Sequence, residues 1–395
     1  MDDTLKSPAM KPPPTFSPVT LLTPPRVEFG ASCLEHALTG IAAGKQQALI
    51  VTTAAVHAHA ERAQVALAAT GAKAAVFVEP PAEPTVSSCE ELLRRARTVG
   101  PDLVVGLGGG SVLDAAKLVA ALAPTADRIS PFFGSGRLPA RRVSLVCVPT
   151  TAGTGSEASP NALLFDETSQ TKKAVIGPSL VPDAAVLDPE LTVSLPAALT
   201  GLTGIDALSH CLEAYASLAA HPLVDVYALE GVRLIARHLA AAVADGGDLS
   251  ARSAVMLGSF YGGLCLGPVN TNGVHALAYP LAGEHHLPHA LSIALMLPHV
   301  VAFNCEALPE RHATLARALG APGDNDDITT ARQLPDRLRG LLRACAIPEE
   351  LGAHGIARDA LPRLADAGLQ VTRLLKANPR PVTLADALHI YEAAF

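Results

Sequence analysis

The first half of the chain alternates between short apolar runs and longer stretches of helical length. Four runs rich in β-branched residues are typical of strands buried on both faces of a parallel sheet. They cover residues 48–52, 74–78, 103–107 and 143–148, and helical stretches such as 55–70 and 88–98 lie between them. This order of strand, helix and strand predicts a doubly wound α/β domain.

The pattern changes further along the chain. Short runs at 161–165, 173–176 and 184–187 predict extra strands or a hairpin. From residue 197 to the end, Ala- and Leu-rich stretches separated by Gly and Pro predict an all-helical half. We therefore expect a dinucleotide-binding domain at 26–192 and a helical, metal-binding catalytic domain at 193–395. Residues 1–25, with seven prolines, are expected to form an extended or disordered arm.

Composition narrows the class of protein. The chain of 395 residues is 49% hydrophobic and 17% charged, which suits large buried cores rather than disorder. Its net charge is −7 and it has no block of Lys and Arg, so we expect no nucleic-acid partner. We expect no membrane partner either, because no apolar run is long enough to span a bilayer. Seven scattered cysteines without a CxxC motif, and a start without signal-peptide features, predict a cytoplasmic location.

A glycine-rich loop follows the third predicted strand. Gly108, Gly109, Gly110 and Ser111 stand between the run 103–107 and a helical stretch at 112–122. Glycines allow close approach of a ligand, and the N-terminus of the following helix attracts an anion, so a phosphate or pyrophosphate is the expected ligand. The loop is not the usual GxGxxG fingerprint, and a plain tight turn is the alternative.

A second polar loop, 149–157, follows the next strand and is rich in hydroxyls. Its position at the carboxyl end of a parallel strand suits the crevice where such sheets bind ligands. The alternative is a Thr-rich turn that caps a helix. Two such loops on successive strands favour the ligand-binding interpretation.

The helical half carries candidate metal ligands. Asp206 and His210 are four residues apart, so both side chains lie on one helical face. His275 and His289 bracket a later segment that contains His285 and His286. Three neutral imidazoles and one carboxylate suit Fe(2+), Zn(2+) or a related divalent metal. A surface pair or a cap is the alternative for the Asp206 and His210 pair alone.

Four strings carry a resemblance to a known family: GLGGGSVLDAAK (106–117), PTTAGTGSEAS (149–159), GIDALSHCLEAYAS (204–217) and HALAYPLAGEHHLPHALSIALMLPHV (275–300). In this order and spacing, the chain from about residue 24 resembles the group III, iron-containing alcohol dehydrogenase family. The resemblance implies a nucleotide-binding domain, a helical domain and a catalytic site in the cleft between them. It implies a metal-dependent, NAD- or NADP-linked alcohol dehydrogenase or aldehyde reductase.

The resemblance also implies roles for individual residues. The metal ligands would be Asp206, His210, His275 and His289. The cofactor would contact Thr53, Gly109, Gly110, Ser111, Asp114, Thr150, Thr151, Thr154, Ser159 and Lys172, with Lys173 an equal alternative to Lys172. Asp114 would approach the nicotinamide. Apart from the resemblance, the candidate proton carriers are Tyr279, His285 and His286, with Asp114 less favoured, and a loop imidazole without a catalytic role is the alternative for His285 and His286. Asp114 and Lys117 could instead form an ordinary pair on a helix face.

Several positions depart from the family pattern. Thr53 stands where an acid often ends the strand, and Glu83 replaces the Asn of a common PNPT string. Tyr279 stands where many members have His, and Ala290 and Ile293 follow His289 in place of a frequent Gly and Asn. We expect NAD(H) use with tolerance of NADP(H), a small alcohol, hydroxyaldehyde or hydroxyacid as substrate, and a homodimer or higher homo-oligomer. The alternatives are a maleylacetate reductase-like oxoacid reductase and, in a different class, a non-enzymatic nucleotide-binding module.

Overall fold

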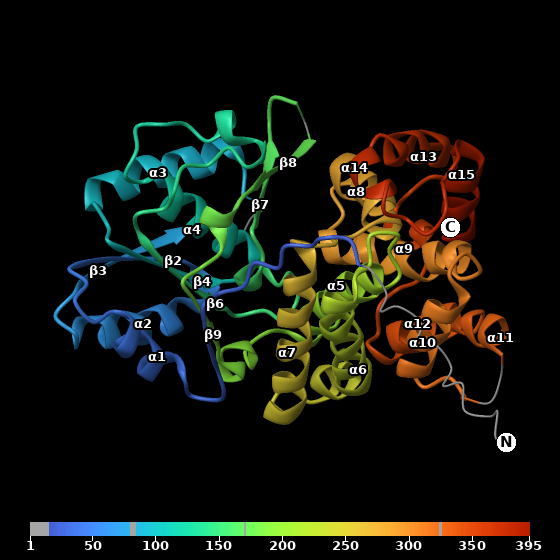
Figure 1. The fold of residues 1–395 in the computed structure, drawn as a ribbon, viewed down its shortest axis with the longest axis horizontal. Helices are drawn as coiled ribbons and strands as arrows, with labels where there is room; N and C mark the ends of the chain where they lie inside the picture. The colour runs from blue at the N-terminus through green and yellow to red at the C-terminus, as the bar shows by residue number, and fades with distance from the viewer. Residues whose placement is uncertain (1–15, 80–83, 170, 324–325) are drawn as a thin grey trace, which may run out of the picture.

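The computed structural model describes residues 16–395 apart from 80–83, 170 and 324–325. Two halves lie side by side (Figure 1): a sheet covered by helices, and a half built of helices alone. In the described part of the chain, no helix is both long and apolar enough to cross a membrane. Most of the predicted N-terminal arm, residues 1–15, lies outside the described residues. So does Glu83, which replaces the Asn of the family's PNPT string.

The first half is built around a six-stranded sheet in which every neighbouring pair is parallel. The strand order is β1-β9-β6-β4-β2-β3. The strands are β1 (Arg26–Phe29), β2 (Gln47–Thr53), β3 (Lys73–Glu79), β4 (Leu103–Gly108), β6 (Ser144–Pro149) and β9 (Ala184–Leu187). The predicted parallel sheet is confirmed, and its central strands are mostly apolar because helices cover both faces.

Two pairs of helices enclose this sheet. One face packs against α1 (Leu34–Ile41) and α2 (His57–Ala68), and the other packs against α3 (Val86–Val99) and α4 (Gly110–Leu122). The alternation of side chains along β2 shows the division, since Ile50 contributes to the first core and Val51 to the second. The doubly wound architecture places the carboxyl ends of β4 and β6 at one edge, where the two polar loops begin.

The three short runs predicted as extra strands have two different fates. β7 (Asn161–Asp166) and β8 (Thr171–Ile176) pair antiparallel and, with β5 (Gly134–Ser135), form a separate three-stranded sheet. The third run, β9, instead lies between β1 and β6 in the main sheet. Figure 1 shows the β7 and β8 ribbons on the side of the sheet half that faces the helical half.

The second half is helical, as predicted, and surrounds one large apolar core. Its helices are α5 (Ala197–Tyr215), α6 (Pro222–Ala244), α7 (Leu249–Leu266), α8 (Gly273–His285), α9 (His289–Asn304), α10 (Pro309–Ala318), α11 (Asp327–Ala331), α12 (Leu334–Ala344), α13 (Leu361–Leu369), α14 (Thr372–Leu375) and α15 (Leu384–Ala393). A 3-10 helix, Pro189–Thr192, lies between β9 and α5. The domain limits at 26–192 and 193–395 stay predictions.

Helix α7 joins the two halves. Its residues Met256, Phe260 and Leu264 form an apolar cluster with residues of β9 and of the turn after β6. At Gly155 and Gly263 the two backbones touch: a Cβ atom added to Gly155 would lie 2.4 Å from the Gly263 Cα atom. This close contact fixes the hydroxyl-rich loop after β6 against the helical half.

Candidate active site

Helix α5 presents two side chains toward the interior of the helical half. Asp206 and His210 are both at least nine-tenths buried and lie one turn apart. The Asp206 Oδ1 atom is 3.6 Å from the His210 Nε2 atom. The predicted shared helical face is therefore present, and neither side chain is a surface residue.

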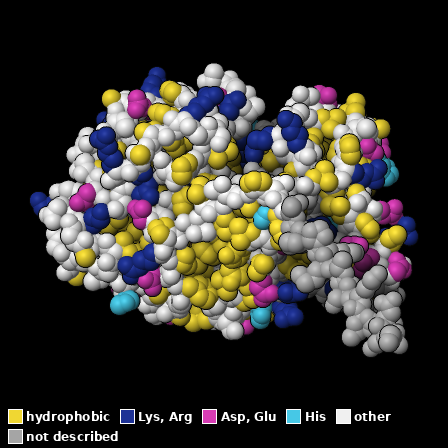
Figure 2. Space-filling model, in the orientation of Figure 1, with side chains coloured by type: hydrophobic (Ala, Val, Ile, Leu, Met, Phe, Trp, Pro, Cys, Tyr) yellow, Lys and Arg dark blue, Asp and Glu magenta, His cyan; other side chains and the backbone are white. Residues whose placement is uncertain are grey.

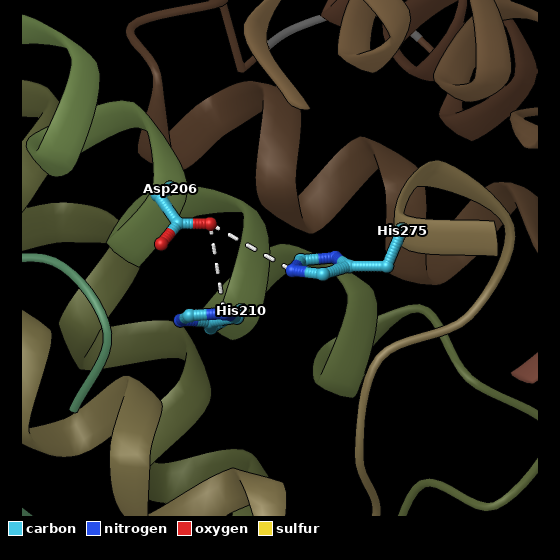
Figure 3. A group of neighbouring side chains, drawn as sticks. All are labelled: Asp206, His210 and His275. Carbon is cyan, nitrogen blue, oxygen red and sulfur yellow. Dashed lines mark ion pairs between the residues drawn. The ribbon is translucent and has the colours of Figure 1, made fainter. Parts of the chain in front are cut away.

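Two more imidazoles approach the same carboxylate oxygen. His275 lies in the first turn of α8, and His289 is the first residue of α9. The Nε2 atom of each is 3.7 Å from the Asp206 Oδ1 atom. Figure 3 shows Asp206 and His210 on one helix, with the His275 ring reaching toward Asp206 from another segment. Residues up to 83 positions apart in the chain thus meet around one oxygen atom.

The charges of this cluster suit a cation. Burial alone would raise the pKa of the Asp206 carboxyl, but the three imidazoles and Lys172 hold it below its ordinary value. Burial lowers the pKa of His210. Burial and the positive charge of Lys172 lower the pKa of His289 to about 3. An ionised carboxylate with neutral His210 and His289 beside it is the protonation state that metal coordination requires.

Unpartnered polar atoms show that the cluster fits a metal ion. Asp206 Oδ1 and His275 Nε2 are buried and have no hydrogen-bond partner within the described ranges. Leaving such atoms without a partner costs about 1–3 kcal/mol each, so a native structure seldom does so without a functional reason. Ligand atoms of Asp206, His210 and His275 all lie within 4.8 Å of one another. The Nε2 atom of His289, 3.7 Å from Asp206 Oδ1, is the fourth candidate ligand atom. A mixed nitrogen and oxygen set of this kind suits Fe(2+) or Zn(2+).

Sequence reasoning missed a fifth member of the site, Glu213. This residue follows Asp206 by seven positions, so it lies on the same face of α5, and it is 1% exposed. Its Oε2 atom contacts the Nδ1 atom of His275, and its Oε1 atom accepts the backbone N–H groups of Asn272 and Val274 at 2.8 Å. The helical spacing from Asp206 was the only signal in the sequence.

The two polar loops of the sheet half meet above the N-terminus of α4. A Cβ atom on Gly110 would lie 2.6 Å from the Thr154 hydroxyl oxygen, and one on Gly109 would lie 3.6 Å from that of Thr151. Ser111, in the first turn of α4, is exposed. The two loops are therefore packed against each other, with the hydroxyls of Thr151 and Thr154 beside the N-terminus of α4. Thr150 is 96% buried.

Asp114 and Lys117 form more than an ordinary pair on a helix face. Lys117 is completely buried, and its Nζ atom donates to the carbonyl oxygens of Ser159 at 3.0 Å and Asn161 at 2.8 Å. Asp114 accepts the Ser156 hydroxyl at 2.5 Å and the Leu163 backbone N–H at 2.9 Å. Burial raises the pKa of the Asp114 carboxyl despite the nearby ammonium group. These contacts fasten the start of β7 to α4.

Ser159 and Thr53, both predicted to contact the cofactor, lie in different surroundings. The Ser159 hydroxyl is 3.3 Å from the buried Lys117 Nζ atom, and the residue is only 2% exposed. Thr53 ends β2 at the carboxyl edge of the sheet and is half-buried. The geometry of Ser159 suits a packing role, whereas Thr53 lies at the edge where a ribose would be expected.

The predicted proton-transfer residues also separate. The Tyr279 ring lies one turn after His275 on α8, with ring centroids 6.3 Å from His275 and 6.0 Å from His289. The Lys172 ammonium, from β8, lies 5.8 Å from the centre of the Tyr279 ring. His286, by contrast, is the exposed residue that ends α8 in a left-handed conformation. Tyr279 and Lys172 therefore belong to the histidine cluster.

A doubly wound sheet with a helix N-terminus suited to an anion, next to a helical half with a metal-suited cluster, is typical of metal-dependent, nucleotide-linked oxidoreductases. Residues 24–189 match the family described as iron-containing alcohol dehydrogenase, and residues 200–395 match the C-terminal part of the same family. The chain belongs to the iron-containing alcohol dehydrogenase family.

Individual relatives agree with this assignment. Long-chain-alcohol dehydrogenase 1 of Geobacillus thermodenitrificans is 39% identical over 81% of this chain and 82% of its own length. The crystal structure of a 1,3-propanediol oxidoreductase superposes with a TM-score of 0.92 and 29% identity, covering 96% of this chain and all of its own. Sulfoacetaldehyde reductase of Bifidobacterium kashiwanohense, solved in complex with NAD+, gives a TM-score of 0.85 at 25% identity, over 96% and 99% of the two chains.

The sequence prediction of family, fold and enzyme class is thereby confirmed. The chain is an oxidoreductase, a metal-dependent alcohol dehydrogenase or aldehyde reductase, with NAD as a supported cofactor. A non-enzymatic nucleotide-binding module does not account for the unpartnered atoms of the cluster.

Proposed function

We propose that the protein interconverts a small alcohol and its aldehyde or ketone with NAD(H), at one Fe(2+) ion held by Asp206, His210, His275 and His289. The observation that carries this proposal is the approach of three imidazole Nε2 atoms to within 3.7 Å of one buried carboxylate oxygen. A divalent metal bound there supplies Lewis acidity to a hydroxyl or carbonyl oxygen. Zn(2+) suits the same ligands, so metal analysis decides between the two.

In this proposal the sheet half binds and orients the cofactor. The N-terminus of α4 offers unpaired N–H groups and a positive dipole end at Gly109, Gly110 and Ser111, which suits a pyrophosphate. The hydroxyl loop, through Thr151 and Thr154, lies against this site and faces the helical half. The backbone contact between Gly155 and Gly263 supports a fixed distance between that loop and the metal-binding helices. Such alignment is what hydride transfer requires of the protein.

Lys172 and Tyr279 are proposed to complete the substrate end of the cleft. The Lys172 ammonium lies over the Tyr279 ring, close enough to the cluster to lower the pKa values of Asp206 and His289. A cation here attracts an anionic partner, either a cofactor oxygen or a polar substituent of the substrate. Tyr279 can donate a hydrogen bond to the substrate, and it is the better proton-transfer candidate because His286 is exposed at the end of α8.

Neutral Thr53 at the end of β2 supports NAD(H) use with tolerance of NADP(H). A carboxylate at this position would accept a hydrogen bond from the ribose 2′-hydroxyl and repel a 2′-phosphate. Thr53 does neither strongly, since its hydroxyl can donate or accept. The cofactor preference is therefore proposed to be moderate.

Oligomer and location are proposed on separate grounds. The outer strand β1 carries Val27 and Phe29, which are 42% and 43% exposed. Exposed apolar side chains on an edge strand favour association with a second chain. Figure 2 shows hydrophobic side chains gathered over the middle of one face, which favours association as well. We propose a homodimer or higher homo-oligomer, which the mass in solution would verify. The seven cysteines are unpaired, which supports a reducing, cytoplasmic location.

The experiment that tests the function combines metal analysis with turnover. Anaerobically purified protein should hold about one divalent metal ion per chain and oxidise NAD(P)H with a panel of short aldehydes, hydroxyaldehydes and oxoacids. His289→Ala should lose metal and turnover while still binding NAD+. His57→Ala, on the exposed face of α2, is the control and should retain both. Full metal content and turnover in His289→Ala would contradict the proposed ligand set.

A further inference from the structure

Glu213 has two sets of hydrogen-bond partners, and each constrains the other. Its Oε1 atom accepts backbone N–H groups at the start of α8, from Asn272 and Val274 at 2.8 Å and from His275 at 3.4 Å. Its Oε2 atom contacts the Nδ1 atom of His275. In the described part of the chain the carboxylate therefore meets N–H donors on one oxygen and an imidazole on the other.

The hydrogen-bond donors determine the tautomer of His275. A carboxylate is only an acceptor, so Nδ1 of His275 must carry the proton that it donates to Glu213. In a neutral imidazole this leaves a lone pair on Nε2. Nε2 is the atom that lies 3.7 Å from Asp206 Oδ1, too far for a hydrogen bond, and it has no hydrogen-bond partner among the described residues.

We infer that Glu213 is a positioning residue that fixes His275 as the Nδ1–H tautomer and aims its Nε2 lone pair at the metal site. The inference rests on the proposed metal site, and it assigns a task to a residue outside the ligand set. Helix α5 thereby contributes three residues on one face, because Asp206 and His210 are proposed ligands and Glu213 orients a third ligand on α8.

Asn272 strengthens the same junction. Its side-chain amide donates to the Glu213 carbonyl oxygen at 2.8 Å, and its own carbonyl oxygen accepts the backbone N–H of Gly273 at 2.6 Å. The last turn of α5 and the first turn of α8 are thus joined by side-chain and backbone hydrogen bonds between the buried residues Glu213, Asn272 and His275. The His275 ring is held in one direction before any metal binds, which lowers the ordering cost of coordination.

Glu213→Gln is the sharpest test because it preserves size and removes one acceptor. If the amide oxygen keeps the backbone N–H groups of α8, the amide NH2 group faces His275 Nδ1, which must then accept. The proton moves to Nε2, where it blocks coordination. We expect the dissociation constant for Co(2+), measured in competition with a chelator, to rise about 10- to 100-fold. Glu284→Gln, the same change at an exposed position on α8, the helix that carries His275, should leave Co(2+) binding unchanged.

A readout without metal separates this role from general stabilisation. The ring ¹⁵N shifts of His275 in the apoprotein, assigned by their absence from His275→Gln, should show the Nδ1–H tautomer in the parent and the Nε2–H tautomer in Glu213→Gln. Glu213→Asp retains the carboxylate and should keep the parent tautomer, and the tautomer of the parent itself is the test if the Gln variant does not fold. A parent-like tautomer together with parent-like Co(2+) affinity in Glu213→Gln would overturn the inference.

The experiment also distinguishes failure of the inference from failure of the proposed function. If the parent protein binds no divalent metal, the proposed metal site is wrong, whatever the tautomer. If the parent binds Co(2+) but His275 has its proton on Nε2, the metal site stands and the role of Glu213 is refuted.

Discussion

Gly155 offers a quantitative test of how the two halves are held together. Its φ angle of +59° is in the left-handed region, and an added Cβ atom would lie 2.4 Å from Gly263 Cα, 2.6 Å from Gly263 N and 2.9 Å from the Ser259 carbonyl oxygen. All three are backbone atoms, so no side-chain rotation relieves the contact. Gly155→Ala must therefore either move the hydroxyl loop or push α7 away from it.

The magnitude follows from two separable costs. An alanine in the left-handed region costs roughly 1–2 kcal/mol, and overpacking a rigid contact adds about 1–3 kcal/mol. Gly136 is the matched control, because its φ angle is +71° but an added Cβ atom meets nothing within 4 Å. We expect Gly136→Ala to lower the free energy of unfolding by the first cost alone, and Gly155→Ala by about 2–5 kcal/mol in total.

The assay is urea denaturation of both variants under identical conditions, with turnover measured alongside. The Gly155→Ala variant should also lose kcat, since the loop that carries Thr154 would shift relative to the metal-binding helices. Gly136→Ala should keep the parent kcat. Equal destabilisation by the two substitutions would refute the reasoning, because it would mean that the contact between Gly155 and Gly263 is not tight.

Three further outcomes are expected. Catalytic efficiency with NADH over NADPH should differ by less than about a thousandfold, roughly 4 kcal/mol, because Thr53 neither repels nor attracts a 2′-phosphate; a larger ratio in steady-state kinetics would contradict this. Tyr279→Phe should keep metal and cofactor affinity but lower kcat/KM for hydroxy- or oxo-substituted substrates more than for simple alkyl aldehydes, and equal losses would leave Tyr279 as a packing residue. Burial raises the pKa of Glu157 from 4.5 to about 7, so the folded state retains this proton where the unfolded state has lost it. Its ionisation therefore lowers stability as pH rises from about 4.5 to 7, and Glu157→Gln should gain up to about 3 kcal/mol over the parent across that range; a pH-independent difference in unfolding free energy would count against it.

The sheet and its helices could be predicted because the signals are local. A strand buried on both faces needs a nearly continuous apolar run, and β4 has one over its whole length and β6 from Leu145 onward. The helical half lacks such runs and was also predicted correctly as a class. The role of the run 184–187 was not determined by its sequence, because only strand order distinguishes a central strand such as β9 from an added hairpin.

In the candidate site, too, residues with a local sequence signal could be predicted and residues defined by distant contacts could not. Asp206 and His210 are visible as a pair at helical spacing, and the two polar loops are visible as breaks after strands. The buried state of Lys117 is not visible, because its acceptors lie 42 and 44 residues away and a lysine three positions after an aspartate is common on exposed helix faces.

Glu213 shows why residues that position a ligand are harder to find than the ligands themselves. A glutamate in the last turns of an Ala- and Leu-rich helix resembles a solvated charge, and its seven-residue spacing from Asp206 is the only sign in the sequence that it faces the interior. Its partners begin 59 residues later, at the start of another helix. Its task is defined by which atom of His275 remains without a partner, and that is a property of the three-dimensional hydrogen-bond network. Coordination by His275 therefore depends on a residue that only the fold brings to it, and metal affinity should respond to changes at this junction even where every proposed ligand is intact.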